Sequence, residues 1–261
     1  MKNITRRNLL LITFLAIISI FCINSPFQLL DLGSSSEVSS NVMIKKSNVN
    51  YPTILADQKA QSINYVEKYS LRNHNVLVDL FNKGKDFFPK IASVFTSYGV
   101  PTEMKVLIAI ESGFKANAVS KAGAVGYWQM MDEMAVGYGL NINKKSKTGD
   151  ERKNFDKSTT AAARYLRDAC NEFDNNVLLA VAAYNCGSGN VRKAIKKSGV
   201  DSETASFWDI KQNLPKETQY YVMNFIALNV IFDNYDKFSN NQLVFQPQQI
   251  AYVQKQSNPV L

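Results

Sequence analysis

The sequence predicts an all-α protein, on three observations. Across residues 71–238 apolar side chains recur at helical spacing, as at Val177, Leu178 and Val181. Over the same stretch there are few segments in which polar and apolar residues alternate between tight turns, which is the pattern expected of strands. Residues that start helices also recur along it. At 261 residues the chain has room for one such helical domain with extensions at both ends.

The first clear helix is expected from Pro101 to Ile110. Proline suits the first position of a helix because its fixed φ and missing N–H cost nothing there. Ser112 and Gly113 then end the helix. Three more helices follow from capping residues or a proline at their starts: Ser158 to about Phe173, Asn176 to about Asn185, and Pro215 to Asn234.

The second and third of these four helices form a hairpin with its turn near residues 174–176. This turn places Cys170 opposite a residue near Ala180, about 9 Å along the helix axis from Cys186 at roughly 1.5 Å per residue. That offset exceeds the Cα separation that a disulfide allows. We therefore expect both thiols to be free and buried.

The chain divides into four parts: an N-terminal export signal or anchor (1–24), a low-complexity linker and lead-in (25–70), the helical domain (71–238) and a Gln-rich tail (239–261). In the first part Lys2, Arg6 and Arg7 precede an apolar run at residues 9–23, as in a signal peptide. This run is shorter than the roughly 20 residues of a membrane span, which favours cleavage over a retained anchor. Lipid attachment at Cys22 is a further alternative, although Phe21 is bulky for a lipoprotein signal.

The linker is rich in Ser and Asn up to about Asn50, and the tail is rich in Gln. Neither shows an apolar face that could be buried. We expect the linker to be dispensable for stability and the tail to be loosely held.

The composition narrows the partner and excludes several chemistries. Lys and Arg number 30 against 22 Asp and Glu, with a pI near 9.2, which favours a polyanion such as nucleic acid, anionic lipid or cell wall. An export signal argues against nucleic acid, and the basic residues Arg192, Lys193, Lys196 and Lys197 are expected to form a solvated helix face. His74 is the only histidine and no Cys-x-x-Cys pair exists, so we expect no metal and no cofactor.

The candidate catalytic residue is Glu111, at the end of the apolar segment 106–110. Leu107, Ile110 and Phe114 would desolvate this carboxyl, and the negative end of the helix dipole also disfavours its anion. Such a side chain can donate a proton to a glycosidic oxygen, since a sugar leaves poorly as an alkoxide. For Glu111 alone, a solvated carboxylate is the simpler interpretation.

Three sequence blocks resemble the lytic transglycosylase domain, which has a lysozyme-like fold. The first block runs from Glu111 to Gln129 (Glu-Ser-Gly-Phe-Lys-Ala-Asn-Ala-Val-Ser-Lys-Ala-Gly-Ala-Val-Gly-Tyr-Trp-Gln). The second is Ala-Ala-Tyr-Asn-Cys-Gly-Ser-Gly-Asn-Val at 182–191, and the third is Leu-Pro-Lys-Glu-Thr-Gln-Tyr-Tyr-Val at 214–222. With Asp-Glu-Arg at 150–152, the order is most similar to the membrane-bound lytic murein transglycosylase D group.

The resemblance implies that Glu111 is the single acid and base. It further implies that Ser120 and Gln129 lie beside the bound sugar and that Tyr184 and Asn185 line the opposite wall. Tyr221 would hydrogen-bond the Glu111 carboxyl and help to hold its proton. Core packing with a satisfied hydroxyl is the alternative for both tyrosines, and packing is the favoured role of Trp128.

Two departures from the family pattern stand out. After Gln129 the family continues with Met-Pro-x-Thr-Ala, whereas this chain has Met131, Asp132, Glu133, Met134 and Ala135. Asp132 is expected to replace the lost proline as an N-terminal helix cap. Gln219 stands where the third block usually has Arg, so any ion pair made by that Arg is lost.

The implied activity is cleavage of the β-1,4 bond between N-acetylmuramic acid and N-acetylglucosamine, leaving 1,6-anhydro ends. The peptidoglycan glycan strand would be the partner, in the periplasm or cell envelope, with N-terminal membrane attachment left open. Two alternatives remain: a lysozyme-type hydrolase on the same fold, and a catalytically silent wall-binding protein.

Overall fold

The computed structural model describes residues 42–143, 145 and 149–251. Its first half contains β1 (Val42–Lys45), η1 (Thr53–Gln58), α1 (Lys59–Arg72), α2 (His74–Gly84), α3 (Phe88–Ser97), η2 (Thr102–Val106), α4 (Leu107–Ser112) and α5 (Asp132–Gly137). Its second half contains η3 (Glu151–Lys153), α6 (Phe155–Glu172), α7 (Val177–Cys186), α8 (Ser188–Ser198), α9 (Phe207–Ile210), η4 (Lys211–Asn213), α10 (Lys216–Asp233), α11 (Tyr235–Ser239) and β2 (Gln248–Ala251). The predicted all-α class is confirmed, with the β1–β2 pair as an addition.

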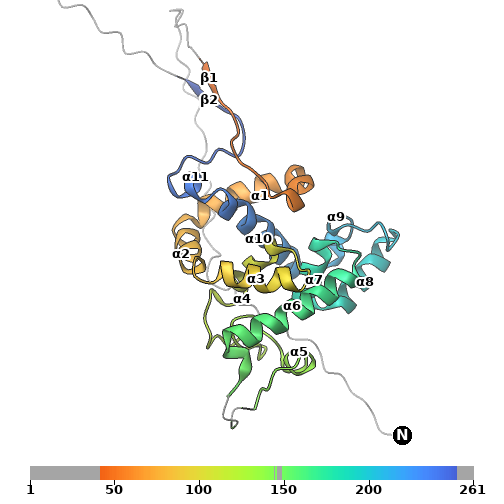
Figure 1. Cartoon of the computed structure of the whole chain (residues 1–261). Helices are drawn as coiled ribbons and strands as arrows, with labels where there is room; N and C mark the ends of the chain where they lie inside the picture. Colours follow the sequence, from red (N-terminus) through yellow and green to blue (C-terminus); the bar gives the residue numbers. More distant parts are fainter. Residues whose placement is uncertain (1–41, 144, 146–148, 252–261) are drawn as a thin grey trace, which may run out of the picture.

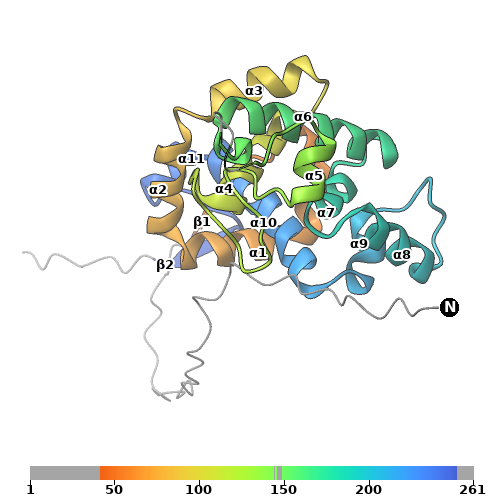
Figure 2. The ribbon, with the colours of Figure 1, turned by 90° about the horizontal axis from the view of Figure 1, so that it is seen from below.

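The helices surround two buried segments, α7 and α10. Both are apolar around most of their circumference, which is the pattern of a helix covered on all sides. α6 packs on α7, and α1 packs along α10. The short helix α4 lies near the centre of this helical body (Figure 2), with Leu107 and Ile108 fully buried.

Three of the four predicted helix starts need correction. Asn154, not Ser158, caps α6: its side chain accepts a hydrogen bond from the Lys157 N–H, and Ser158 lies inside the helix. Pro101 and Pro215 each precede the first helical residue, and the segment after Pro101 begins as the 3-10 helix η2. Asn176 caps α7 as predicted.

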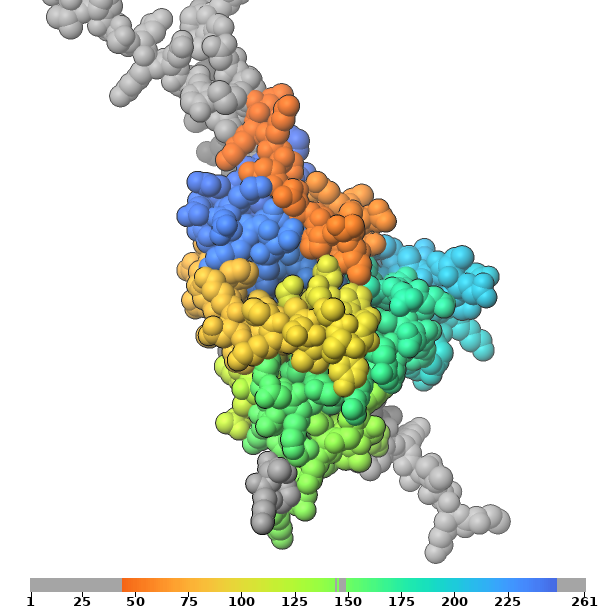
Figure 3. All heavy atoms as spheres, viewed as in Figure 1, coloured from red at the N-terminus to blue at the C-terminus, as the bar shows by residue number. Residues whose placement is uncertain are grey.

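The two ends of the described chain lie together, contrary to the expected linker and loose tail. β1 and β2 form an antiparallel pair with Lys45 opposite Gln248. Next to this pair, the Ser47 hydroxyl donates to the Phe245 carbonyl, and Phe245 is buried. Figures 1 and 3 show the two segments side by side above the helices. The linker interpretation is therefore wrong from residue 42 onward, and so is the loose-tail interpretation up to residue 251.

The helical body also begins before the predicted boundary at residue 71. α1 and η1 precede that position, and Leu55 and Val66 on them are fully buried in the core. Within the described ranges no helix is long and apolar enough to cross a membrane. The export signal at 1–24, including Cys22, lies outside the described residues.

Cys170 and Cys186 are free and buried, as the hairpin offset predicts. Burial raises the pKa of the Cys170 thiol to about 11. This thiol therefore stays protonated at neutral pH, which is the state of an unreactive core cysteine.

Asn234 joins the N-terminal segment to the end of α10 and offers a test of this arrangement. Its amide donates to the Asn50 carbonyl at 2.7 Å and to the Val230 carbonyl at 2.7 Å, and its carbonyl accepts from the Asn50 N–H at 3.0 Å. Asn234→Ala removes these three hydrogen bonds, and at about 0.5–1.5 kcal/mol net per bond the expected loss of stability is roughly 1–3 kcal/mol. We expect the melting temperature to fall by roughly 3–8 °C.

The matched control is Asn240→Ala, which removes one exposed hydrogen bond to Asp236. Calorimetry should show almost no change for this control. Equal melting temperatures for the wild type and Asn234→Ala would mean that the hydrogen bonds between Asn234 and Asn50 add nothing to stability.

Candidate active site

Glu111 occupies the last turn of α4, where the chain is forced away from the helix. Gly113 ends α4 in the left-handed conformation, with φ of 55°, and its N–H bonds the Ala109 carbonyl. Upstream of Glu111, α4 is apolar and belongs to the core. The sequence therefore places one carboxyl at the rim of a hydrophobic helix, as predicted.

The Glu111 carboxyl favours its protonated form. Removal from water raises its pKa, and the charge of Glu217 acts in the same direction. A hydrogen bond from Tyr221 opposes these two effects, and the resulting pKa is about 8. At neutral pH most Glu111 side chains therefore carry a proton.

Tyr221 makes the expected contact with Glu111, but with the opposite effect on its proton. The Tyr221 hydroxyl donates to Glu111 Oε1 at 2.5 Å. A donor stabilises the carboxylate more than the acid, so this bond lowers the pKa of Glu111 instead of raising it. Tyr221 is thus placed to stabilise the ionised form of Glu111. Burial and the nearby Glu111 hold the pKa of the Tyr221 hydroxyl well above its usual value.

Asn185 and Thr218 connect the second sequence block to the third. The Thr218 hydroxyl donates to Asn185 Oδ1 at 2.7 Å, joining the end of α7 to the first turn of α10. Glu217, the neighbour of Thr218, lies one helical turn before Tyr221. Partial burial raises the pKa of Glu217 as well. Two carboxyls with raised pKa values therefore lie within electrostatic reach of each other.

A tight turn at residues 126–130 follows Glu111 in the first block, and two side chains hold its carbonyl groups. Ser112, adjacent to Glu111, donates to the Tyr127 carbonyl at 2.7 Å. Tyr184 donates to the Trp128 carbonyl at 2.8 Å. Tyr184 is buried and this turn satisfies its hydroxyl, while its expected place in the wall of the sugar site remains a prediction. Its pKa is raised by burial and by the Glu111 charge, which places Tyr184 close to the carboxyl.

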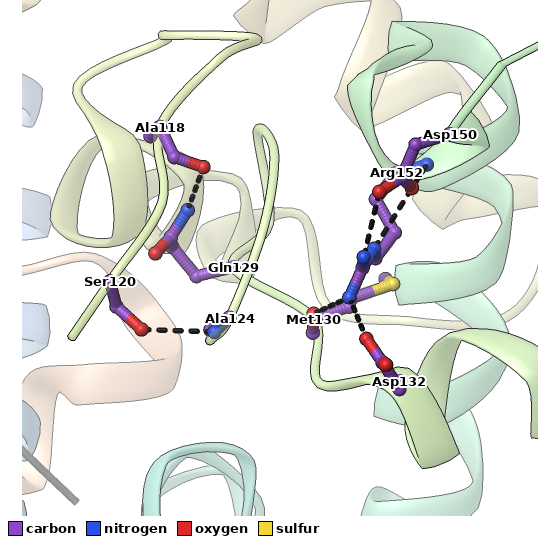
Figure 4. A network of polar contacts seen from close by, with 8 residues as sticks. All are labelled: Ala118, Ser120, Ala124, Gln129, Met130, Asp132, Asp150 and Arg152. Carbon is purple, nitrogen blue, oxygen red and sulfur yellow. Dashed lines mark hydrogen bonds and ion pairs between the residues drawn. The ribbon is translucent and has the colours of Figure 1, made fainter. Parts of the chain in front are cut away.

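Ser120 and Gln129 shape the same loop (Figure 4). The Ser120 hydroxyl accepts from the Ala124 N–H at 3.0 Å. The Gln129 amide donates to the Ala118 and Gly126 carbonyls at 3.1 and 2.9 Å, and the Gln129 backbone is left-handed with φ of 45°. The sugar contacts expected of both residues remain a prediction, while their hydrogen bonds here fix the loop.

Arg152 and Asp132 make contacts that the local sequence pattern did not predict. Asp132 caps no helix: it is the first residue of α5, and its carboxylate pairs with Arg152. Arg152 also donates to the Met130 carbonyl and pairs with Asp150 (Figure 4). Gly126 fits against this segment because a Cβ there would lie 2.0 Å from the Arg152 carbonyl oxygen. Because residue 126 is a glycine, this loop can pack directly against the backbone of Arg152.

The remaining expectations concern packing and surface charge. Trp128 is fully buried and donates to Thr159, which confirms its packing role. Gln219, in place of the family's Arg, donates to the Leu214 carbonyl and so secures the start of α10. The basic residues of α8 are exposed, as expected of a solvated face.

The sequence interpretation missed Ser112, Arg152 and the electrostatic effect of Glu217. All three residues lie in the segments that carry the family resemblance, and this position in the sequence was the signal that could have pointed to them. Their partners lie too far along the chain to follow from local spacing: Ser112 bonds a residue 15 positions away and Arg152 one 22 positions away.

Comparisons with known proteins agree with the first two blocks, which lie within the matched residues. Residues 95–207 match the transglycosylase SLT domain. The chain is 36% identical over 172 residues to the membrane-bound lytic murein transglycosylase D of Escherichia coli, which covers 66% of this chain and 37% of that protein. The chain thus spans little more than a third of this relative's length.

Solved structures with partial likeness include two further proteins. The lytic transglycosylase Slt of Pseudomonas aeruginosa gives a TM-score of 0.46 at 24% identity, over 59% of this chain and 25% of that one. The 70 kDa soluble lytic transglycosylase of Escherichia coli gives 0.45 at 16% identity, over 77% and 39%.

Proposed function

Residues 95–207 of this chain belong to the transglycosylase SLT domain family, and from this premise we propose that the protein is a peptidoglycan lytic transglycosylase with Glu111 as its acid and base. The supporting observation is the raised pKa of Glu111 beside the Tyr221 hydroxyl. The proposed substrate is the glycan strand of peptidoglycan. The net positive charge of the chain suits such an anionic wall polymer.

In the proposed reaction Glu111 first acts as the acid. Its proton passes to the glycosidic oxygen between N-acetylmuramic acid and N-acetylglucosamine as the C–O bond breaks, and the leaving sugar departs as an alcohol. The pKa near 8 keeps this proton available at neutral pH. Tyr221 then stabilises the carboxylate that remains.

The same carboxylate next acts as the base. It removes the proton from the 6-hydroxyl of the muramoyl residue while that oxygen bonds to the anomeric carbon. The product is a 1,6-anhydro end, and Glu111 regains its proton for the next cycle. No water is consumed, so the step needs no second carboxylate to activate one.

A lysozyme-type hydrolase is the alternative that one observation favours. Glu217 lies within electrostatic reach of Glu111, and hydrolytic glycosidases use a second carboxylate. The product decides between the two reactions, since hydrolysis leaves a reducing end. A silent wall-binding protein is disfavoured because Glu111 and its hydrogen-bond partner are both in place.

The cell envelope is the proposed location. The N-terminal sequence pattern supports export, and the related Escherichia coli protein is named as membrane-bound. Measuring the size and the membrane partitioning of the mature protein would show whether this chain is released, lipidated at Cys22 or anchored.

Glu111→Gln should abolish glycan cleavage while the protein stays folded. Gln keeps the size of the protonated acid but has no proton to give, and general acid catalysis alone contributes about 10² to 10⁴ in rate. The measurement is mass spectrometry of muropeptides released from purified sacculi, with Glu203→Gln as an exposed control carboxylate. A folded Glu111→Gln protein that releases anhydro-muropeptides at more than about a tenth of the normal rate would reject Glu111 as the catalyst.

Tyr221→Phe should lower kcat. It should also move the alkaline limb of the pH profile of kcat/KM to higher pH. An acid with a raised pKa is active below that pKa and loses activity as pH rises through it, near 8 in the wild type. Removing the donor destabilises the carboxylate, so the pKa of Glu111 rises further.

Tyr220→Phe on the exposed face of α10 is the matched control and should leave the limb in place. A limb that moves to lower pH in Tyr221→Phe would show that Tyr221 holds the proton on Glu111, contrary to the hydrogen-bond direction.

A further inference from the structure

The turn at residues 126–130, here called the Gln129 turn, is tied to a buried arginine that has no part in the proton transfers. We propose that Asp132 and Arg152 are positioning residues, which hold the Gln129 turn in the shape that binds the glycan strand. This inference rests on the proposed function, because it concerns how the same site holds its substrate.

The Arg152 guanidinium donates hydrogen bonds to three residues, Asp150, Met130 and Asp132. Its Nε and Nη2 donate to the two oxygens of Asp150 at 2.9 and 2.7 Å, in the two-pronged geometry that fixes a guanidinium plane. Its Nη1 then points at the Met130 carbonyl, 3.2 Å away, and at the Asp132 carboxylate. The Arg152 and Asp150 side chains are only 4% and 3% exposed, so water competes little for these bonds.

The Gln129 turn has a shape that needs such support. Gln129 is a non-glycine residue with positive φ, a conformation that most side chains disfavour. The turn is closed by paired hydrogen bonds between Val125 and Met130, at 3.1 and 3.2 Å. Because the Met130 carbonyl also accepts from Arg152, the guanidinium holds the closing residue of the turn directly.

Asp132 is the part of this cluster that most plainly distinguishes the chain from its family pattern, which has proline at this position. Proline would restrict the backbone at the start of α5 but offers no charge to Arg152. Asp132 instead links α5 to Arg152 and so holds the turn from its C-terminal side (Figure 4). Its side chain is 68% exposed, so its removal leaves the buried Arg152–Asp150 pair intact.

A role in substrate positioning has a recognisable signature. The influences on the Glu111 pKa are burial, Tyr221 and Glu217, and the Arg152 cluster is not among them. Loss of Asp132 should therefore weaken glycan binding and raise KM, while kcat and the alkaline limb stay near their wild-type values. A purely structural role would lower thermal stability and the active fraction together.

The test compares Asp132→Ala with Glu172→Gln, which removes another surface carboxylate paired with an arginine, Arg192. Both are made in the full chain and again in the Glu111→Gln background, where binding to purified sacculi is measured by sedimentation without turnover. Asp132→Ala should bind about threefold to fivefold more weakly, because a pair with one largely exposed partner can bias the turn toward its binding shape by about that factor at most. Asp132→Asn keeps an acceptor oxygen and should lose less.

Hydrogen exchange of the peptide spanning residues 118–135 gives a second readout. The amides of Val125, Gln129 and Met130 should exchange faster in Asp132→Ala, with unchanged exchange in α7 and a melting temperature close to wild type. Arg152→Ala is avoided as the main variant because it strands the buried Asp150 charge and endangers folding.

Sacculus binding within twofold of the parent protein would overturn the proposal. Faster exchange throughout α7 and α10 would overturn it as well, since the effect would then be global. Failure of the wild-type protein to cleave peptidoglycan would refute the proposed function. The positioning role is tested separately, because sacculus binding and hydrogen exchange are measured without turnover.

Discussion

Desolvation of one carboxyl at the end of α4 is the constraint around which the site is arranged. The helix is apolar where it fills the centre of the domain, and Gly113 then turns the chain away, so the Glu111 carboxyl lies partly buried at the end of that helix. The raised pKa is a direct consequence of this position. Tyr221 on α10 limits the effect by stabilising the anion, which keeps the pKa near the range that suits the proposed roles of Glu111 as acid and base.

Three side chains from different parts of the chain donate to the carbonyl groups of one turn. Ser112 beside Glu111 holds Tyr127, Tyr184 on α7 holds Trp128, and Arg152 holds Met130. Glu111 and the Gln129 turn are thereby held close to each other through backbone carbonyl acceptors, which require side-chain donors at defined positions. Such rigid support is what a site needs to keep reacting groups in a productive geometry.

Much of the fold and of the candidate site could be predicted from the sequence where the determinants are local. The apolar run before Glu111 and the glycine after it define both the helix end and the perturbed acid. The pairing of β1 with β2 could not be predicted, because its partners lie at opposite ends of the described chain and neither segment has a strong strand pattern. Asp132 was expected to cap a helix because capping is a local rule, whereas its actual partner is brought near only by the fold. The Tyr221 contact followed from family resemblance, but the direction of its effect required knowing which group donates.

Direct titration of Glu111 tests the central claim. NMR of protein carrying ¹³C-labelled glutamate would follow the side-chain carboxyl shifts with pH, and Glu111→Gln would identify the resonance. The account predicts a midpoint of about 8 for Glu111. A midpoint near 4.5, the ordinary value for glutamate, would contradict the claim that burial keeps this carboxyl protonated at neutral pH.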